Sequence, residues 1–168
     1  MNFHSYVFPF SKKDYIRGKK PDVKCILCSV IQKDKRVQSL EILRTDKFVI
    51  SLNLFPYNNG HALIFPLRHI TDIRELSEEE DIELARLTKS YITLLEEIYK
   101  PTGYNVGYNL GEYAGASISH LHLHIIPRYQ NELGVIDLIG GSKVLVENPL
   151  ETLEKIKSHI KDRNIFNI

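Results

Sequence analysis

The strictest hydrophobic pattern in the chain is an alternation within residues 119–128. Three histidines, His120, His122 and His124, alternate there with apolar residues at a period of two. In an extended strand this period places every second side chain on the same face, whereas a helix would scatter the histidines around its circumference. The pattern therefore predicts a strand with the three histidines on one face and the intervening apolar residues pointing into a core.

Shorter apolar segments bounded by turn residues predict the rest of a sheet. The first two of these segments are expected to pair through a turn at 45–47. Besides the histidine segment, the expected strands are 41–44, 48–52, 61–66, 104–110 and a short one at 143–146. A short helix is expected from Cys25 to about Gln32.

A long helix and a C-terminal helix complete the predicted elements. Ser77 and Glu80 have the spacing of a capping box, which opens a helix that runs to about Tyr99 and is ended by Pro101. Its apolar positions, at steps of three and four residues, are Ile82, Ala85, Leu87, Tyr91, Leu94, Leu95 and Ile98. The final helix begins at Pro149, and its expected apolar face is Leu150, Leu153, Ile156 and Ile160. Because strands and helices do not alternate strictly, the predicted fold class is α+β, an antiparallel sheet of about five strands with the long helix packed on it.

Length and composition predict one globular domain over residues 1–168. The chain has 168 residues, 43% hydrophobic and 26% charged, with a net charge of +1, which gives no general case for nucleic-acid or membrane affinity. The N-terminus lacks a signal-peptide pattern, and no apolar run approaches the roughly 20 residues of a membrane span, so a cytoplasmic location is expected. Residues 1–22 are expected to form an irregular arm, 23–128 the core and 129–168 a C-terminal extension with its helix.

The histidine alternation is open to three interpretations from the residues alone. It is a polar outer face, a metal site on a strand, or a catalytic face. Three of only seven histidines occupy the alternate positions. Because histidine is neutral enough near pH 7 to act as a nucleophile and easily protonated, the catalytic interpretation is favoured.

Cys25 and Cys28 are the two cysteines of the chain. Their spacing is typical of a redox pair or of half a zinc site. A redox motif would normally lie in an alternating βαβ pattern, which is not evident here. Half a zinc site requires two further ligands, which must be histidines elsewhere.

The segment His120-Leu-His122-Leu-His124-Ile-Ile-Pro-Arg resembles the His-x-His-x-His signature of the histidine triad family of nucleotide hydrolases and transferases. With the matching segments below, the resemblance covers most of residues 23–161. It implies a HIT-like fold with His122 as the nucleophile, which forms a nucleotidyl-histidine intermediate with the α-phosphate. It also implies that the His120 carbonyl holds the proton of His122, and that His124 donates to a phosphate oxygen.

Asn53 and His61 match a second family segment, in which the Asn contacts the ribose and the His supports the catalytic histidines. From the residues alone, Asn53 could equally cap a turn and His61 be a satisfied core histidine.

A third segment contains Asn109 and the loop of Gly115, Ala116 and Ser117. The resemblance implies that Asn109 faces the phosphates and that Ser117 meets the α-phosphate. Backbone N–H groups of glycine-bearing loops and hydroxyls commonly hold anions, which agrees with this role.

Cys25, Cys28, His69 and His120 match ligand positions in zinc-containing members of the family. Two cysteines and two histidines form a closed tetrahedral set, so a structural zinc and no organic cofactor are expected. The zinc would orient His120 and, through its carbonyl, fix the tautomer of His122. Two thiols without metal are the alternative.

The reaction is expected to be cleavage of diadenosine tetraphosphate, with phosphorolysis slightly favoured. The runs 114–118 and 139–144 and the helix beyond Pro149 resemble the dinucleoside polyphosphate phosphorylase branch. That branch typically has Thr-Asn-Phe where this chain has 133–135, so hydrolysis remains a close alternative to phosphorolysis. The alternatives are an asymmetric hydrolase, a phosphoramidate hydrolase, a non-catalytic nucleotide-binding protein and a zinc-binding regulator. The family also implies a homodimer.

Overall fold

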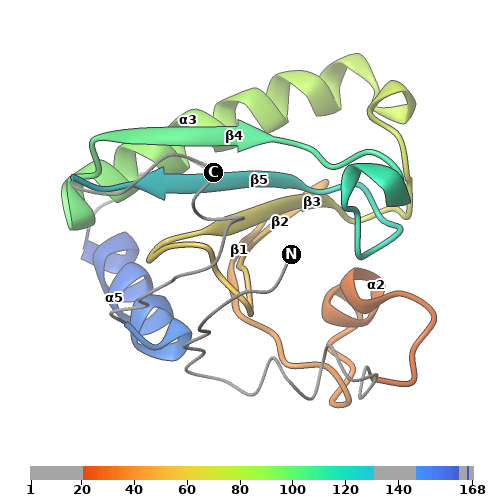
Figure 1. Ribbon diagram of the computed structural model, residues 1–168, viewed down its shortest axis with the longest axis horizontal. Helices are drawn as coiled ribbons and strands as arrows, with labels where there is room; N and C mark the ends of the chain where they lie inside the picture. Colours follow the sequence, from red (N-terminus) through yellow and green to blue (C-terminus); the bar gives the residue numbers. More distant parts are fainter. Residues whose placement is uncertain (1–20, 131–146, 163–165, 167–168) are drawn as a thin grey trace, which may run out of the picture.

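The fold is built on one antiparallel sheet with the strand order β1-β2-β3-β5-β4 (Figure 1). The computed structural model describes residues 21–130, 147–162 and 166. The strands are β1 (Glu41–Arg44), β2 (Phe48–Leu52), β3 (Ala62–Pro66), β4 (Gly103–Gly107) and β5 (Leu123–Arg128). Helices α2 (Ile26–Ile31), α3 (Glu78–Tyr99) and α5 (Pro149–Asp162) complete it, with 3-10 turns at Ile73–Glu75 and Glu112–Ala114. The predicted α+β class with a five-stranded sheet, a long helix and a C-terminal helix is confirmed.

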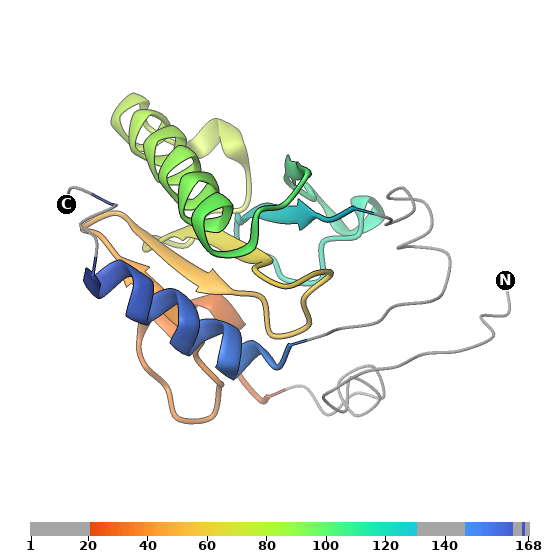
Figure 2. The same ribbon diagram turned by 90° about the vertical axis from the view of Figure 1, so that its left-hand side faces the viewer.

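The two faces of the sheet are covered by different elements. The long helix α3 and the C-terminal helix α5 pack on one face, and both are seen beside the sheet in Figure 2. Their buried side chains join those of Ile50 and Ile125 in the larger apolar core. The short helix α2 covers the other face, where Val49 and Phe65 form a smaller cluster with Leu27. This second face carries the candidate chemistry.

Helix α3 begins at the predicted capping box. The Ser77 hydroxyl accepts from the Glu80 backbone N–H at 3.3 Å, and the Glu80 carboxylate accepts from the Ser77 N–H at 2.8 Å. Both contacts satisfy backbone donors that a helix N-terminus would otherwise leave unpaired. The helix ends at Lys100, which adopts the left-handed conformation with φ of 50° directly before Pro101.

Two of the predicted apolar faces are wrong in part. Ile82 is 67% exposed and Ala85 is exposed, because the buried stripe of α3 instead begins at Leu84. Ile82 lies two residues before Leu84, or about 200° around the helix. In α5, Leu150 is 43% exposed, and Thr152 is buried in its place. Thr152 stands four residues before the buried Ile156, so the two share a face.

The histidine segment is only partly a strand. Strand β5 begins at Leu123, so His120 and His122 precede it. Backbone groups of residues 120 and 121 form hydrogen bonds with partners other than a neighbouring strand. The Leu121 N–H donates to the Ile70 carbonyl at 2.7 Å, and the His120 carbonyl accepts from the His122 ring. The prediction that all three histidines lie on one strand is therefore wrong, since β5 contains only His124.

Other boundaries shift by a few residues. Strand β4 spans Gly103–Gly107 instead of 104–110, and β3 begins at Ala62 instead of His61. The predicted strand at 143–146, the runs at 133–135 and 139–144 and nearly all of the N-terminal arm lie outside the described residues. In the described part of the chain, no helix combines the length and the apolar character that crossing a bilayer requires.

Candidate active site and metal centre

A cavity of about 620 Å³ opens between α2, the sheet face it covers and the loop before β5. Its apolar lining includes Ile26, Leu27, Val30, Val37 and Leu63. Its polar lining includes Asn53, Asn109, Gly115, Ser117, His122 and His124. A volume of this size and a small set of converging polar groups are typical of small-molecule sites.

His122 has a defined tautomer in this cavity. Its Nδ1 lies 2.7 Å from the His120 carbonyl oxygen, and because a carbonyl only accepts, Nδ1 carries the proton. The Nε2 atom then presents a lone pair. Burial lowers the pKa of His122, which keeps the ring neutral near pH 7. A neutral imidazole with a fixed Nδ1 proton is a competent nucleophile.

A second chain of hydrogen bonds sets the proton of His124. The Tyr57 backbone N–H donates to His61 Nδ1 at 2.9 Å, so the His61 proton is on Nε2. That Nε2 lies 3.0 Å from His124 Nδ1, which must accept, and the His124 proton is thereby placed on its own Nε2. Among the described residues, His124 Nε2 is a buried polar atom without a hydrogen-bond partner. Burial, aided by His122, lowers the pKa of His124 to about 4.

His61 is held in place by the backbone before it. The ring is fully buried, and its Nδ1 also lies 3.4 Å from the Asn53 side-chain nitrogen. Gly60 adopts a φ of +80°, and a Cβ there would lie 2.7 Å from Leu95 Cδ2, so glycine is required at this turn. Asn53 Oδ1 accepts from the Phe55 N–H at 3.2 Å, a turn contact that leaves the Asn53 amide lining the cavity.

The loop before the histidines is curled around Gly115, which has a φ of +88°. Asn109, Gly115 and Ser117 all line the cavity that contains His122. Ala116 does not, since it lines a neighbouring hollow bounded by residues 71–74. The structure thus brings together every residue of the predicted nucleotide set except Ala116.

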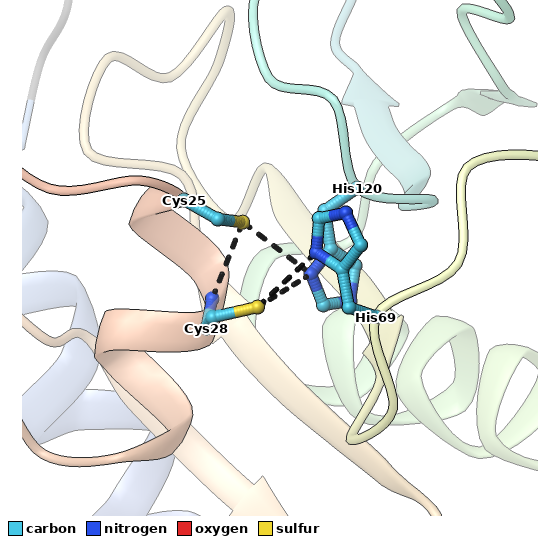
Figure 3. Close-up of side chains that lie close together, drawn as sticks. All are labelled: Cys25, Cys28, His69 and His120. Atoms are coloured by element: carbon cyan, nitrogen blue, oxygen red, sulfur yellow. Dashed lines mark hydrogen bonds between the residues drawn. The ribbon is translucent and has the colours of Figure 1, made fainter.

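The two cysteines and two histidines predicted as metal ligands form one cluster (Figure 3). Their ligand atoms all lie within 4.8 Å of one another. Cys28 Sγ is 3.2 Å from His69 Nδ1 and 3.5 Å from His120 Nδ1, and Cys25 Sγ is 3.5 Å from His120 Nδ1. A tetrahedral zinc with the usual bond lengths places neighbouring sulfur and nitrogen ligands roughly 3.5 Å apart. The donor set and its spacing fit a zinc ion.

His120 connects this cluster to the cavity. Its Nε2 lies 3.0 Å from the Pro66 carbonyl oxygen, so Nε2 carries the proton and Nδ1 presents its lone pair to the sulfurs. Burial lowers the pKa of His120 to about 4, which favours the neutral form that a metal ligand requires. Burial, followed by the neighbouring Cys25, raises the pKa of the Cys28 thiol to about 11 in the absence of metal. The opposite end of His120, its carbonyl, holds the His122 proton.

Three contributors to the site were not predicted from the sequence. The Tyr57 N–H and the Pro66 carbonyl are backbone groups, and no side-chain pattern identifies them. Ser51 lines the cavity from β2. Its signal was available, because a serine interrupts the otherwise apolar strand Phe48–Leu52.

Comparison with known proteins places this geometry in a family. The family model described as "HIT domain" matches residues 32–131. An AP-4-A phosphorylase of Mycobacterium tuberculosis is 38% identical over 109 residues, which cover 64% of this chain and 56% of that protein. A bis(5'-nucleosyl)-tetraphosphatase (asymmetrical) of Schizosaccharomyces pombe is 29% identical over 117 residues, 70% of this chain and 64% of that protein.

The solved structures agree on the fold. A crystal structure of a zinc-bound histidine triad family protein from Mycobacterium smegmatis aligns with a TM-score of 0.68 at 20% identity, over 83% of this chain and 94% of that chain. At that identity the likeness concerns the fold alone. The family model, however, matches more than half of the sequence, including the three alternating histidines. The chain therefore belongs to the HIT family, the histidine triad family that its sequence resembles.

Proposed function

We propose that this chain cleaves dinucleoside polyphosphates, such as diadenosine tetraphosphate, through a covalent intermediate on His122. The observation that carries the proposal is the 2.7 Å contact between His122 Nδ1 and the His120 carbonyl, which leaves Nε2 as the nucleophilic atom. The names of the two relatives, a phosphorylase and a tetraphosphatase, support the substrate class. Both matches cover less than two thirds of the relative's length.

In the first step, His122 Nε2 attacks the α-phosphorus, and the bond from phosphorus to the leaving nucleotide's oxygen breaks. The leaving oxygen takes the electron pair, and the His124 Nε2–H stabilises it by donating a hydrogen bond. The proton stays on His122 Nδ1 and is donated in a hydrogen bond to the His120 carbonyl oxygen as the ring becomes positively charged. We expect Asn109 and Ser117, which line the same cavity, to hold phosphate oxygens.

In the second step, an acceptor attacks the same phosphorus and the phosphorus–nitrogen bond breaks, which returns the neutral imidazole. We propose inorganic phosphate as the preferred acceptor, which yields ADP and ATP from diadenosine tetraphosphate. Water instead yields AMP and ATP.

The products decide between the acceptors. The purified chain is incubated with diadenosine tetraphosphate, with and without inorganic phosphate, and the nucleotides are separated by chromatography. ADP with ATP, formed only with phosphate, supports phosphorolysis, and AMP with ATP in both reactions shows hydrolysis. An absence of turnover in both would contradict the proposed function. For a substitution at His122, the matched control is His159→Ala. His159 lies on α5, paired with Glu97, outside the cavity, so its loss is expected to leave turnover unchanged.

We also propose that Cys25, Cys28, His69 and His120 hold one structural zinc. When bound, the metal supplies a rigid cross-link between α2 and the segments before β5 and after β3. The site is supported by the distances between the four ligand atoms, which all lie within 4.8 Å of one another. Metal analysis is expected to find one zinc per chain, and His69→Ala is expected to lower that content. Zinc-replete protein with less than half an equivalent would contradict the site.

A homodimer formed through β4 is the proposed assembly. Strand β4 is at the edge of the described sheet, and Val106 on it is 46% exposed. An open edge strand can pair with a second copy. Sedimentation of the purified chain is expected to give twice the monomer mass, and a Val106→Lys variant is expected to shift it toward the monomer.

A further inference from the structure

A buried serine lines the cavity among apolar side chains of the sheet. Ser51 is 6% exposed and lines the cavity from β2. Its neighbours on this face of the sheet include Val49, Leu63 and Phe65, which belong to the apolar cluster under α2. A hydroxyl in such a position contributes nothing to apolar packing.

The strand register places Ser51 in line with the catalytic histidines. Ser51 pairs with Leu63 on β3, and Leu63 pairs with His124 on β5. Directly opposite residues of an antiparallel pair point to the same face, so the three side chains form a row across the cavity floor. At the usual strand spacing, Ser51 lies roughly 10 Å from His124. A ligand with its phosphate at the histidines that lies along this row would bring its other end to Ser51.

The Ser51 hydroxyl has its proton engaged and its lone pairs free. It donates to the Leu52 carbonyl at 3.1 Å, within its own strand. A serine hydroxyl has one donor and two acceptor lone pairs, so this arrangement leaves Ser51 as an acceptor facing the cavity. Arg36 and Gln38, which also line the cavity, are exposed.

We propose that Ser51 determines base specificity by accepting a hydrogen bond from the exocyclic amino group of an adenine base. The inference rests on the proposed function, because it requires a nucleotide in this cavity. The apolar walls provide the contacts for the faces of the base, and the Ser51 oxygen reads one edge of it. A base with a carbonyl oxygen at that edge has no proton to give and is disfavoured.

The test compares two nucleotides that differ by one group. AMP and purine riboside 5'-monophosphate are identical except that the latter lacks the 6-amino group, and calorimetry gives the Kd of each. One added hydrogen bond is expected to make AMP bind about 3- to 10-fold more tightly to the wild-type chain. In Ser51→Ala that ratio is expected to fall to about 1, through weaker AMP binding alone.

Two variants complete the design. Ser51→Thr retains the hydroxyl and is expected to restore a preference for AMP. Ser29→Ala removes an equally buried hydroxyl from α2, outside the cavity, and is expected to keep the wild-type ratio. Equal binding of the two nucleotides by the wild-type chain, or an unchanged ratio in Ser51→Ala, overturns the inference alone. Failure of the wild-type chain to bind either nucleotide overturns the proposed function and the inference with it.

Discussion

The two faces of the central sheet differ although the same strands form them. The face under α3 and α5 presents apolar side chains only: Phe48, Ile50, Leu52, Ala62, Ile64, Leu123 and Ile125. The face under α2 presents Val49, Ser51, Leu63, Phe65 and His124. A period of two thus separates residues that stabilise the fold from residues that carry the chemistry.

The difference is also one of solvation. Burying a large apolar side chain on the α3 face stabilises the fold by about 1.5–3 kcal/mol. A buried imidazole on the other face has to be neutral and hydrogen-bonded. The lowered pKa values of His120, His122 and His124 reflect this burial. We therefore expect substitutions on the two faces to have separate consequences, for stability on one and for turnover on the other.

The sharpest separation is expected at His122. His122→Ala removes the nucleophile, so turnover of diadenosine tetraphosphate is expected to fall on the order of 10⁴-fold or more. The free energy of unfolding is expected to fall by only about 1–2 kcal/mol, the cost of leaving the buried His120 carbonyl without its hydrogen-bond partner. Steady-state kinetics and urea denaturation measure the two quantities. A variant that retains turnover would show that His122 is not the nucleophile.

The converse effect is expected on the α3 face. Leu94 is fully buried, and Leu94→Ala is expected to lower the free energy of unfolding by about 3 kcal/mol while kcat of the folded protein stays near wild type. The matched control is Leu150→Ala on α5, where the side chain is 43% exposed and the expected change is within about 0.5 kcal/mol. A large loss of kcat in Leu94→Ala under stabilising conditions would show that the two faces are coupled.

A smaller effect on the chemical face is expected from His61. The His61 ring accepts from the Tyr57 N–H at Nδ1 and therefore donates from Nε2 to His124 Nδ1. The His124 proton is thereby placed on its Nε2. His61→Ala is expected to reduce kcat about 10²-fold, because His124 loses its fixed tautomer. The Kd for AMP, measured by calorimetry, is expected to change by less than about 3-fold, because a tautomer effect acts mainly on the chemical step. A parallel loss of AMP binding would instead indicate that the cavity had collapsed.

The sequence predicted the elements better than it predicted the histidine segment. The Ser77–Glu80 capping box and the strand pairing between 41–44 and 48–52 are local signals, and both are present. The start of β5 at Leu123 depends on the contact between Leu121 and the Ile70 carbonyl, which is distant in sequence. The periodicity of a sequence indicates which side chains share a face. It does not predict the hydrogen-bond partners of the backbone, which determine where a strand begins.

The candidate site shows the same division. The resemblance to the histidine triad family identified six residues that line the cavity and the four that form the cysteine–histidine cluster. The six are Asn53, Asn109, Gly115, Ser117, His122 and His124. The atoms that set the proton positions were not predictable, since the Tyr57 N–H and the Pro66 carbonyl are backbone groups. Ile82 was assigned to the apolar face because it stands three residues before Ala85, but both are exposed, since the buried apolar stripe of α3 begins at Leu84.

One ion pair links the two faces and gives the smallest expected effect. Glu80, in the capping box of α3, accepts from Arg68 Nε at 2.8 Å and Nη2 at 2.6 Å, and Arg68 directly precedes the proposed metal ligand His69. Arg68 lowers the pKa of the Glu80 carboxyl from 4.5 to about 2. A carboxyl whose pKa is lowered by folding stabilises the protein above its unfolded pKa, and this contribution is lost as the pH falls from about 4.5 toward 2.

Glu80→Gln is therefore expected to lower the free energy of unfolding by about 1 kcal/mol at pH 7, a modest value because the Arg68 side chain is 46% exposed. The difference from wild type is expected to shrink as the pH falls below about 4.5, since the wild-type carboxyl then becomes protonated as well. Urea denaturation across this pH range measures the difference in unfolding free energy between the variant and the wild type. Glu78→Gln is the control, because Glu78 is exposed in the same first turn and is expected to show a smaller difference at every pH. If Glu80→Gln also weakens zinc binding, Arg68 transmits the state of the α3 face to His69, and the two faces are not independent. If only the unfolding free energy changes and zinc binding does not, then the α3 face affects stability without affecting the metal site, even through the ion pair that links the two faces.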